Sequence, residues 1–287
     1  MPSIYKNNKV HSELRLIYKE DRFNRHFYGK DEKDKFLTIA WNQGEDQTVI
    51  VDGTEYSFPK NAVLSLMINQ SFDFYNSKSI VAWQFNREFY CIVDHDKEVS
   101  CVGFLFYGSS QLMFVKLDTK QQRKLALLFR VFEEEFETAD NIQEDMLRML
   151  IKRLIIIVTR LAKIQYLPAE NFDDDKLDIM RRYNLLVENN FHTQHGVKFY
   201  AARLYRSPKT LSNLFAIYNR KSPIAVIHDR IILEAKRLLL YTDKTIKEIA
   251  FELGYEDAAY FSNFFKKQTS RSPSDFKNAK ASSFLKK

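Results

Sequence analysis

The stretch LSNLFAIYNRKSP, residues 211–223, recurs fifty positions later as FSNFFKKQTSRSP, residues 261–273. The two copies stay in register from the first residue to the last, and both carry Ser-Asn near the start and Ser-Pro at the end. Self-similarity at a fixed period indicates one structural unit used twice. The residues around each copy show which unit it is.

The residues before the second copy predict a short helix with defined ends. Thr245 and Glu248, three positions apart, form the capping-box pattern that starts helices. Gly254 can take the left-handed conformation that ends a helix, and Asp257 can cap the next one. The apolar faces of the two helices are Ile246, Ile249, Ala250 and Leu253, followed by Phe261, Phe264 and Phe265. Helix, glycine-containing turn and helix form the helix-turn-helix arrangement.

The first copy follows the same logic. Ser207 can cap a helix, and Pro208 takes its first position, where the missing N–H costs nothing. The corresponding apolar faces are Val197, Ala201 and Leu204, followed by Leu211, Leu214 and Phe215. Ser222-Pro223 then starts a further helix. The sequence therefore predicts helix-turn-helix units at about 197–215 and 246–267, joined by a linker helix at about 223–240.

The second helix of each unit presents a polar face. When its apolar residues turn inward, helical geometry turns small, amide and basic side chains outward, and such a face suits the major groove of DNA. The residues predicted to contact bases are Lys209, Ser212, Asn213, Ala259, Ser262 and Asn263. The residues predicted to contact phosphates are Ser207, Arg220, Lys221, Ser222, Lys266, Lys267 and Arg271.

The net charge of +7 belongs to the C-terminal part of the chain. Residues 172–287 hold 21 Lys and Arg against 13 Asp and Glu, whereas residues 1–171 hold 23 against 24. This asymmetry points to a polyanionic partner for one domain only. A basic solvated surface without a partner would have the same charge, so the assignment depends on the repeat.

Around the second unit, the chain resembles the arabinose-regulator (AraC/XylS) family of bacterial transcription factors. The resemblance runs through EAKRLLLYTDKTIKEIAFELGYEDAAYFSNFFKKQTSRSPSDFK, residues 234–277, and extends more weakly back to about Asp178. It implies that two recognition helices enter adjacent major-groove segments, about 34 Å apart. The departures from the family pattern are Tyr205, Asn219 and Ser270, where Gly is usual, and Ala216, where Lys is common.

Residues 1–118 are predicted to form strands. Turn signals separate the runs FLTIAW, QTVIVDG, AVLSLMI, SIVAWQF and CVGFLFYG, which are rich in β-branched and aromatic residues. Short strands at even spacing favour an antiparallel barrel or sandwich, and the region loosely resembles the cupin-like sensing domain of the same family. The predicted fold class is α+β multidomain: a cupin-like domain at 1–118, a helical connector at 119–170 and an all-α DNA-binding domain at 171–287.

The connector carries an apolar seam in steps of three and four residues, which is a heptad pattern. It can pair with a second copy in a homodimer, pack on its own β-domain, or do both at once, and the sequence leaves these possibilities open. The dimerisation candidates are Leu147, Leu150, Leu154, Ile157, Leu161 and Ile164.

An enzyme is the main alternative, because cupin-like barrels can hold catalytic metals. A metal site needs two or three His near a carboxylate, but His26 and His95 stand alone in the β-region, and Cys91 and Cys101 match no ligand spacing. Walker, G-x-S-x-G and dinucleotide patterns are absent from the sequence. We expect no catalytic residue, metal or cofactor. A third possibility is a ligand-binding adaptor whose DNA-binding domain has lost specificity.

The sequence gives neither an effector, nor target genes, nor a direction of regulation. It has no apolar run long enough for a membrane span and no signal-peptide pattern. It therefore predicts a cytoplasmic, sequence-specific transcriptional regulator. The expected partners are double-stranded DNA, a second copy of the chain, a small-molecule effector if one exists, and RNA polymerase if the protein is an activator.

Overall fold

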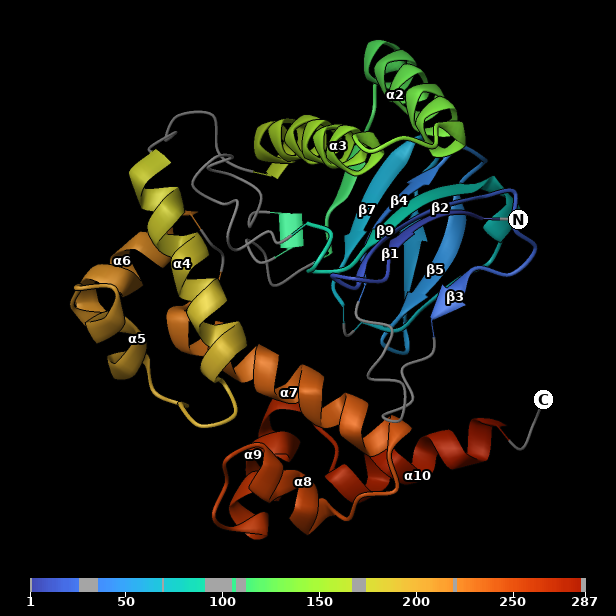
Figure 1. Ribbon diagram of the computed structural model, residues 1–287. Helices are drawn as coiled ribbons and strands as arrows, with labels where there is room; N and C mark the ends of the chain where they lie inside the picture. Colours follow the sequence, from blue (N-terminus) through green and yellow to red (C-terminus); the bar gives the residue numbers. More distant parts are fainter. Residues whose placement is uncertain are drawn as a thin grey trace. The chain divides into compact units, whose positions relative to one another are not determined.

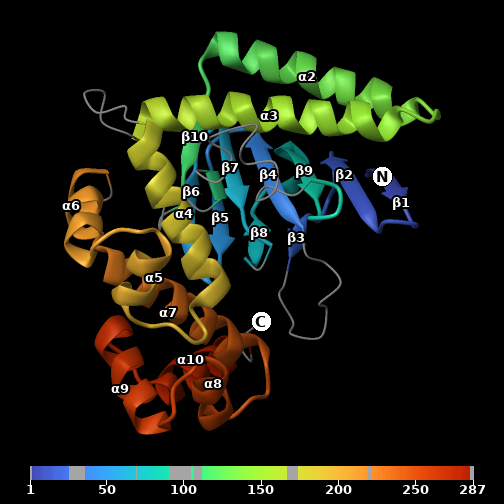
Figure 2. The ribbon, with the colours of Figure 1, turned by 60° about the vertical axis from the view of Figure 1, so that its left-hand side comes forward.

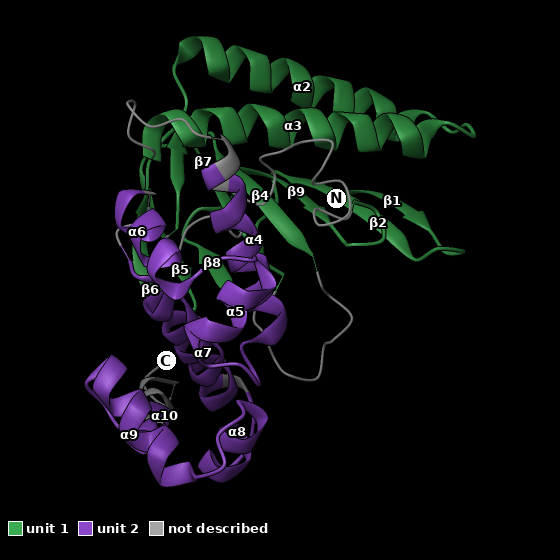
Figure 3. Cartoon of the chain, turned by 90° about the vertical axis from the view of Figure 1, so that its left-hand side faces the viewer, with its two compact units in different colours: residues 1–26, 32–172 green, residues 27–31, 173–287 purple. Residues whose placement is uncertain are grey.

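The computed structural model describes residues 2–25, 36–68, 70–90, 105–106, 112–166, 174–218 and 221–284. Contacts divide these residues into an N-terminal unit, which ends at Tyr166, and a C-terminal unit, which begins at Asp174 (Figure 3). Each unit has a hydrophobic core of its own. Figure 1 labels the elements.

The N-terminal unit holds two sheets in which every strand pair is antiparallel. The six-stranded sheet has the order β1 (Ser3–Asn7), β2 (Ser12–Tyr18), β9 (Ile80–Phe85), β4 (Leu37–Asn42), β7 (Ala62–Leu66) and β10 (Phe114–Lys116). The four-stranded sheet has the order β3 (Asn24–Arg25), β8 (Phe72–Phe74), β5 (Gln47–Val51) and β6 (Thr54–Phe58). With the helical C-terminal unit, this confirms the predicted α+β fold class.

The larger sheet is covered on both faces. Helices α2 (Thr119–Glu137) and α3 (Gln143–Tyr166) lie over one face (Figure 2), and the smaller sheet packs on the other. In β4, Ile39 packs towards the helices and its neighbour Ala40 towards the smaller sheet. Because successive side chains point to opposite faces, covering both faces buries every residue of β4 rather than alternate ones.

Phenylalanines fill the space between the two sheets. The ring of Phe23 lies 5.1 Å from that of Phe72 and 5.6 Å from that of Phe74. Phe58 stacks on the same group, with a centroid distance of 5.8 Å to Phe74. Aromatic burial of this size is a large apolar contribution to the stability of the unit.

Four of the five runs predicted to be strands contain strands. The strand prediction for the fifth run is wrong at its two described residues. In CVGFLFYG the structure describes Leu105 and Phe106, and both are helical. Each is 5% exposed and belongs to the core under α2 and α3. Periodicity cannot separate helix from strand in a short run that is apolar throughout, which explains the error.

Most of the connector seam lies in the core of the N-terminal unit. Leu147 and Leu154 are fully buried in the N-terminal unit, and Leu150 is 8% exposed. Ile157 and Leu161 are partly buried against the same core, and Ile164 is 71% exposed. For these residues, the possibility that α3 packs on its own β-domain therefore holds. Dimerisation through the six candidate residues stays a prediction.

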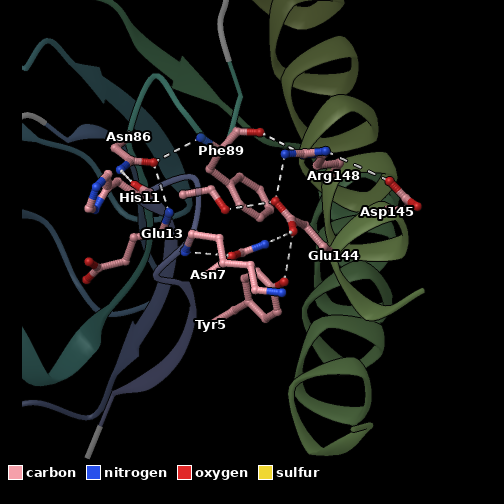
Figure 4. Close-up of polar contacts among 11 residues, drawn as sticks. Tyr5, Asn7, His11, Glu13, Asn86, Phe89, Glu144, Asp145 and Arg148 are labelled. Atoms are coloured by element: carbon pink, nitrogen blue, oxygen red, sulfur yellow. Dashed lines mark hydrogen bonds and ion pairs between the residues drawn. The ribbon is translucent and has the colours of Figure 1, made fainter. Parts of the chain in front are cut away.

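One carboxylate joins the start of α3 to the first two strands (Figure 4). Glu144 accepts hydrogen bonds from Tyr5 Oη at 3.0 Å, Asn7 Nδ2 at 2.9 Å and Ser12 Oγ at 2.8 Å. Arg148 donates to it from the next helical turn at 2.6 Å. Burial alone would raise the pKa of Glu144, but these donors outweigh it and the pKa is lowered.

The C-terminal unit is helical. Its helices are α4 (Asp174–Asn190), α5 (Val197–Arg203), α6 (Pro208–Tyr218), α7 (Pro223–Tyr241), α8 (Ile246–Glu252), α9 (Ala258–Thr269) and α10 (Pro273–Phe284). The long helix α7 contacts all six others, and one core cluster includes residues from both predicted helix-turn-helix units. The two helix-turn-helix units are thus parts of one folded body.

A buried ion network joins α4 to α7. The Arg230 guanidinium binds Glu188 at 2.6 and 2.9 Å and Glu234 at 2.8 Å, and it lies 3.9 Å above the Phe191 ring. Burial alone would raise the pKa of Glu234, but Arg230 and Arg237 outweigh it and the pKa is lowered. Since removing one partner would leave an unpaired buried charge, this network fixes α4 on the linker helix.

Candidate nucleic-acid interface

In the first helix-turn-helix unit, α5 leads through a tight turn into α6. Tyr205 adopts the left-handed conformation with φ of 54°, and the backbone N–H of Arg206 reaches back to the Ala201 carbonyl at 2.9 Å. This 6→1 bond is typical of a helix end. Ser207 then accepts a hydrogen bond from the Thr210 N–H at 3.0 Å, which confirms it as the cap of α6.

The second unit has the same turn. Gly254 has φ of 76°, and the Tyr255 N–H reaches back to the Ala250 carbonyl at 2.9 Å. Thr245 and Glu248 form the full capping box at the start of α8. Asp257 accepts from the Tyr260 N–H at 2.7 Å and caps α9. Each of the predicted start and stop signals is confirmed here.

The second helices turn their apolar residues inward, as expected. In α6, Leu211 and Phe215 are fully buried, and in α9 so are Phe261 and Phe265. The residues predicted to contact bases lie on the opposite faces: Lys209, Ser212, Asn213, Ala259 and Asn263 are exposed, and Ser262 is half-buried. The structure thus places these side chains outward, while their contacts with bases stay a prediction.

The two serines behave alike. Ser212 Oγ donates to the Pro208 carbonyl at 3.0 Å, and Ser262 Oγ donates to the Ala258 carbonyl at 2.7 Å. Each hydroxyl proton is therefore used within the helix, and the oxygen can still accept. We expect the neighbouring amides, Asn213 and Asn263, to carry more of the base selection than the serines do.

The residues predicted to contact phosphates differ in exposure and in the partners that they already have within the protein. Lys266, Lys267 and Arg271 are exposed around the C-terminal end of α9. Lys221 is instead ion-paired with Asp229 at 2.5 Å. The Ser207 and Ser222 hydroxyls cap α6 and α7. Arg220 lies outside the described residues, as does Asn219 among the departures from the family pattern.

Sequence reasoning missed two residues at the start of α6. Arg206 is exposed directly before the cap residue Ser207, and Tyr205 is 86% exposed in the turn. Both lie beside the helix N-terminus, where phosphates bind readily. A basic residue directly before a cap residue is a signal that can be read in the sequence.

Histidines, cysteines and carboxylates do not form a metal site in the part of the chain that the structure describes, where groups of three or more of them are absent. His26, His95, Cys91 and Cys101 lie outside that part. None of the described helices is both long and apolar enough to cross a membrane.

Two capped helix-turn-helix units on one linker helix, with outward polar faces, define a DNA-binding domain. Residues 200–279 match the model of a protein family described as "Helix-turn-helix domain". The chain is 35% identical over 92 residues to the arabinose operon regulatory protein of Escherichia coli (strain K12). The aligned residues are 32% of this chain and 30% of that protein. The chain therefore aligns with less than a third of that relative's own length.

Two solved structures are also similar. The DNA-binding domain of AdpA, solved in complex with a target DNA, is 26% identical with a TM-score of 0.32, covering 35% of this chain and 90% of that one. ToxT from Vibrio cholerae O395 is 15% identical with a TM-score of 0.42, covering 92% of this chain and 96% of that one. The family model and the curated relative confirm the resemblance: the C-terminal unit carries a helix-turn-helix domain of the AraC type.

Proposed function

We propose that the protein is a transcriptional regulator that reads two adjacent segments of duplex DNA with α6 and α9. The observation that carries this proposal is the Ser-Asn pair repeated on the outward faces of both helices, Ser212-Asn213 and Ser262-Asn263, with both asparagines exposed, within one folded unit. An Asn side chain can form two hydrogen bonds with adenine N6 and N7 in the major groove. We therefore expect an adenine at the Asn contact of each half-site.

The other predicted contacts supply position rather than sequence. Lys266, Lys267 and Arg271 would bind phosphates, which orients the protein and makes binding sensitive to salt. Ser207 and Ser222 each accept one N–H at the starts of α6 and α7, and the remaining free N–H groups there would bind phosphates of the DNA backbone. Control by a small molecule through the N-terminal unit, a homodimeric state and contact with RNA polymerase are further parts of this proposal.

The roles can be tested by titrating the full-length protein with duplex DNA at several salt concentrations. Lys267→Ala should weaken binding to all sequences and reduce the slope of log K against log salt by about one. Lys124→Ala is the matched control: it removes the same charge from an exposed position on α2 of the N-terminal unit. Equal slopes for wild type and Lys267→Ala would remove Lys267 from the interface.

A further inference from the structure

The segment Phe191–Gly196 joins α4 to α5, the first helix of the first helix-turn-helix unit, yet it lies against the turn of the second. A Cβ atom on Gly254 would stand 1.9 Å from the backbone oxygen of His192 and 3.4 Å from His195 Nε2. Only glycine permits this approach. We call the segment Phe191–Gly196 the brace.

Two histidines of the brace bind the last carbonyls of α8. His195 Nε2 lies 2.8 Å from the Leu253 oxygen, and His192 Nδ1 lies 3.3 Å from the Glu252 oxygen. A carbonyl only accepts, so each ring nitrogen donates. Carbonyls at a helix C-terminus have no partner within the helix. The brace therefore supplies donors that α8 itself lacks.

The brace also contacts α5 and the residue that follows the second turn. The Tyr200 hydroxyl, on α5, donates to the Gln194 carbonyl at 2.6 Å. The His195 ring packs on Tyr255, with a centroid distance of 4.6 Å and an interplanar angle of 35°. Tyr255 follows the turn directly and contacts Phe261 of α9. A continuous set of contacts thus runs from α5 through the brace to the second recognition helix.

We propose that His195 is a positioning residue that fixes the spacing between the two recognition helices, and therefore the spacing of the two DNA segments that the protein accepts. This inference rests on the proposed function. The linker helix α7 and a shared core already join the two helix-turn-helix units. The brace adds hydrogen bonds and a close backbone contact to the turn before α9, and these set the direction in which α9 leaves the turn. The brace lies before residue 200, where the match to the family model begins.

The test is a spacing profile on the full-length protein. Duplexes carry the two half-sites selected by the wild type, with one base pair added or removed between them. The wild type should bind its preferred spacing at least tenfold more tightly than either altered spacing. His195→Ala should bind the preferred spacing about threefold to tenfold more weakly and discriminate among the three spacings by less than threefold.

Two further variants distinguish a positioning role of His195 from a general loss of folding stability. His195→Gln keeps a donor near the Nε2 position and should retain the wild-type profile. Thr245→Ala removes the capping box of α8, costing about tenfold in folding equilibrium, without touching the brace; it should keep the spacing preference. If His195→Ala does not fold, His195→Leu takes its place.

The outcomes are distinct. A His195→Ala profile parallel to that of the wild type would overturn the inference and leave the brace as a stabilising contact only. Loss of spacing preference in Thr245→Ala as well would also overturn it, because general loosening would then explain the effect. A wild type without two half-sites would instead overturn the proposed function.

Discussion

The two helix-turn-helix units reach the same geometry by different means. In the second unit the signals are local: a capping box at Thr245, a glycine in the left-handed turn and an aspartate cap on α9. In the first unit, Gly196 stands at the N-cap of α5 and provides no side-chain cap, and Tyr205 takes the left-handed position that Gly254 fills in the other copy. A non-glycine residue there costs about 1–2 kcal/mol.

The surroundings of the two turns account for this difference. The Tyr205 side chain is 86% exposed, so a large residue fits there and only the backbone is strained. Gly254 lies under the brace, with no room for a side chain. Glycine is therefore required in the second turn by packing as well as by its dihedral angles, whereas in the first turn only the dihedral angles favour it.

The entrances of the recognition helices differ in charge. Arg206 and Ser207 precede α6, whereas Glu256 and Asp257 precede α9. Basic residues on α9 lie instead in its last turn, at Lys266 and Lys267. We expect the first unit to approach phosphates with its N-terminal end and the second with its C-terminal end.

The largest effect should come from Gly254→Ala. The new methyl group meets the His192 carbonyl and also forces Ala into positive φ, so we expect a loss of about 3 kcal/mol or more in unfolding free energy. Gly53→Ala is the matched control, because Gly53 also has positive φ, 77°, but no atom within 4 Å of the added carbon. It should cost about 1 kcal/mol. Equal losses in chemical denaturation would contradict packing under the brace.

The substitutions Asn213→Ala and Asn263→Ala compare how much each recognition helix contributes to base selection. Each substitution should relax preference at one base of its own half-site, costing about 1–3 kcal/mol there. Competition binding with every base at that position measures the change. A preference that survives in both variants would show that the asparagines do not read the DNA, and survival in only one would assign base selection to a single unit.

Tyr205→Gly should stabilise the protein, which sharpens the comparison from the other side. Relief of the left-handed strain outweighs the greater freedom of glycine in the unfolded chain, for a net gain of about 0.5–1 kcal/mol. Thermal unfolding of the full-length variant measures it. A decrease in stability would mean that the exposed ring makes contacts whose loss exceeds the strain.

The smallest expected effect is a decrease in unfolding free energy at acidic pH. Burial, the largest cause, lowers the pKa of His195, and the carbonyls of Leu253 and Phe191 oppose this; His192 adds a further lowering. The pKa of His228 is also lowered, first by burial, although Asp229 opposes it. The unfolded chain, with an ordinary pKa of about 6.5, therefore takes up protons first. The histidine contribution is complete above about pH 7 and is lost as pH falls through the lowered folded values.

Unfolding measurements between about pH 7 and pH 5 should show this decline, and His195→Gln should reduce it, because the substituted side chain does not titrate. A variant with the same decline as the wild type would assign the pH dependence to other groups.

Much of the C-terminal unit could be predicted because its signals are short-range. The capping residues, the glycine turn and the alternation of apolar and polar residues act within a few positions, and each lies in the structure where the sequence placed it. The outward faces of α6 and α9 followed from the same periodicity.

The failures involve long-range packing. The brace joins residues about sixty positions apart, and no local pattern marks His195 as a partner of Leu253. The seam of α3 looks the same whether it faces a second copy or its own sheet, and only the structure shows that Leu147 and Leu154 are buried in the N-terminal unit. Leu105 and Phe106 lie in a run too uniformly apolar to show a period.

Selection of binding sites from fragmented genomic DNA, with the full-length protein at near-physiological salt, shows whether the two matched recognition helices read DNA together. We expect a discrete motif with two half-sites about one helical turn apart and an adenine in each. Uniform weak recovery, both with the full-length protein and with residues 172–287 alone, would contradict it and favour an adaptor that does not read sequence.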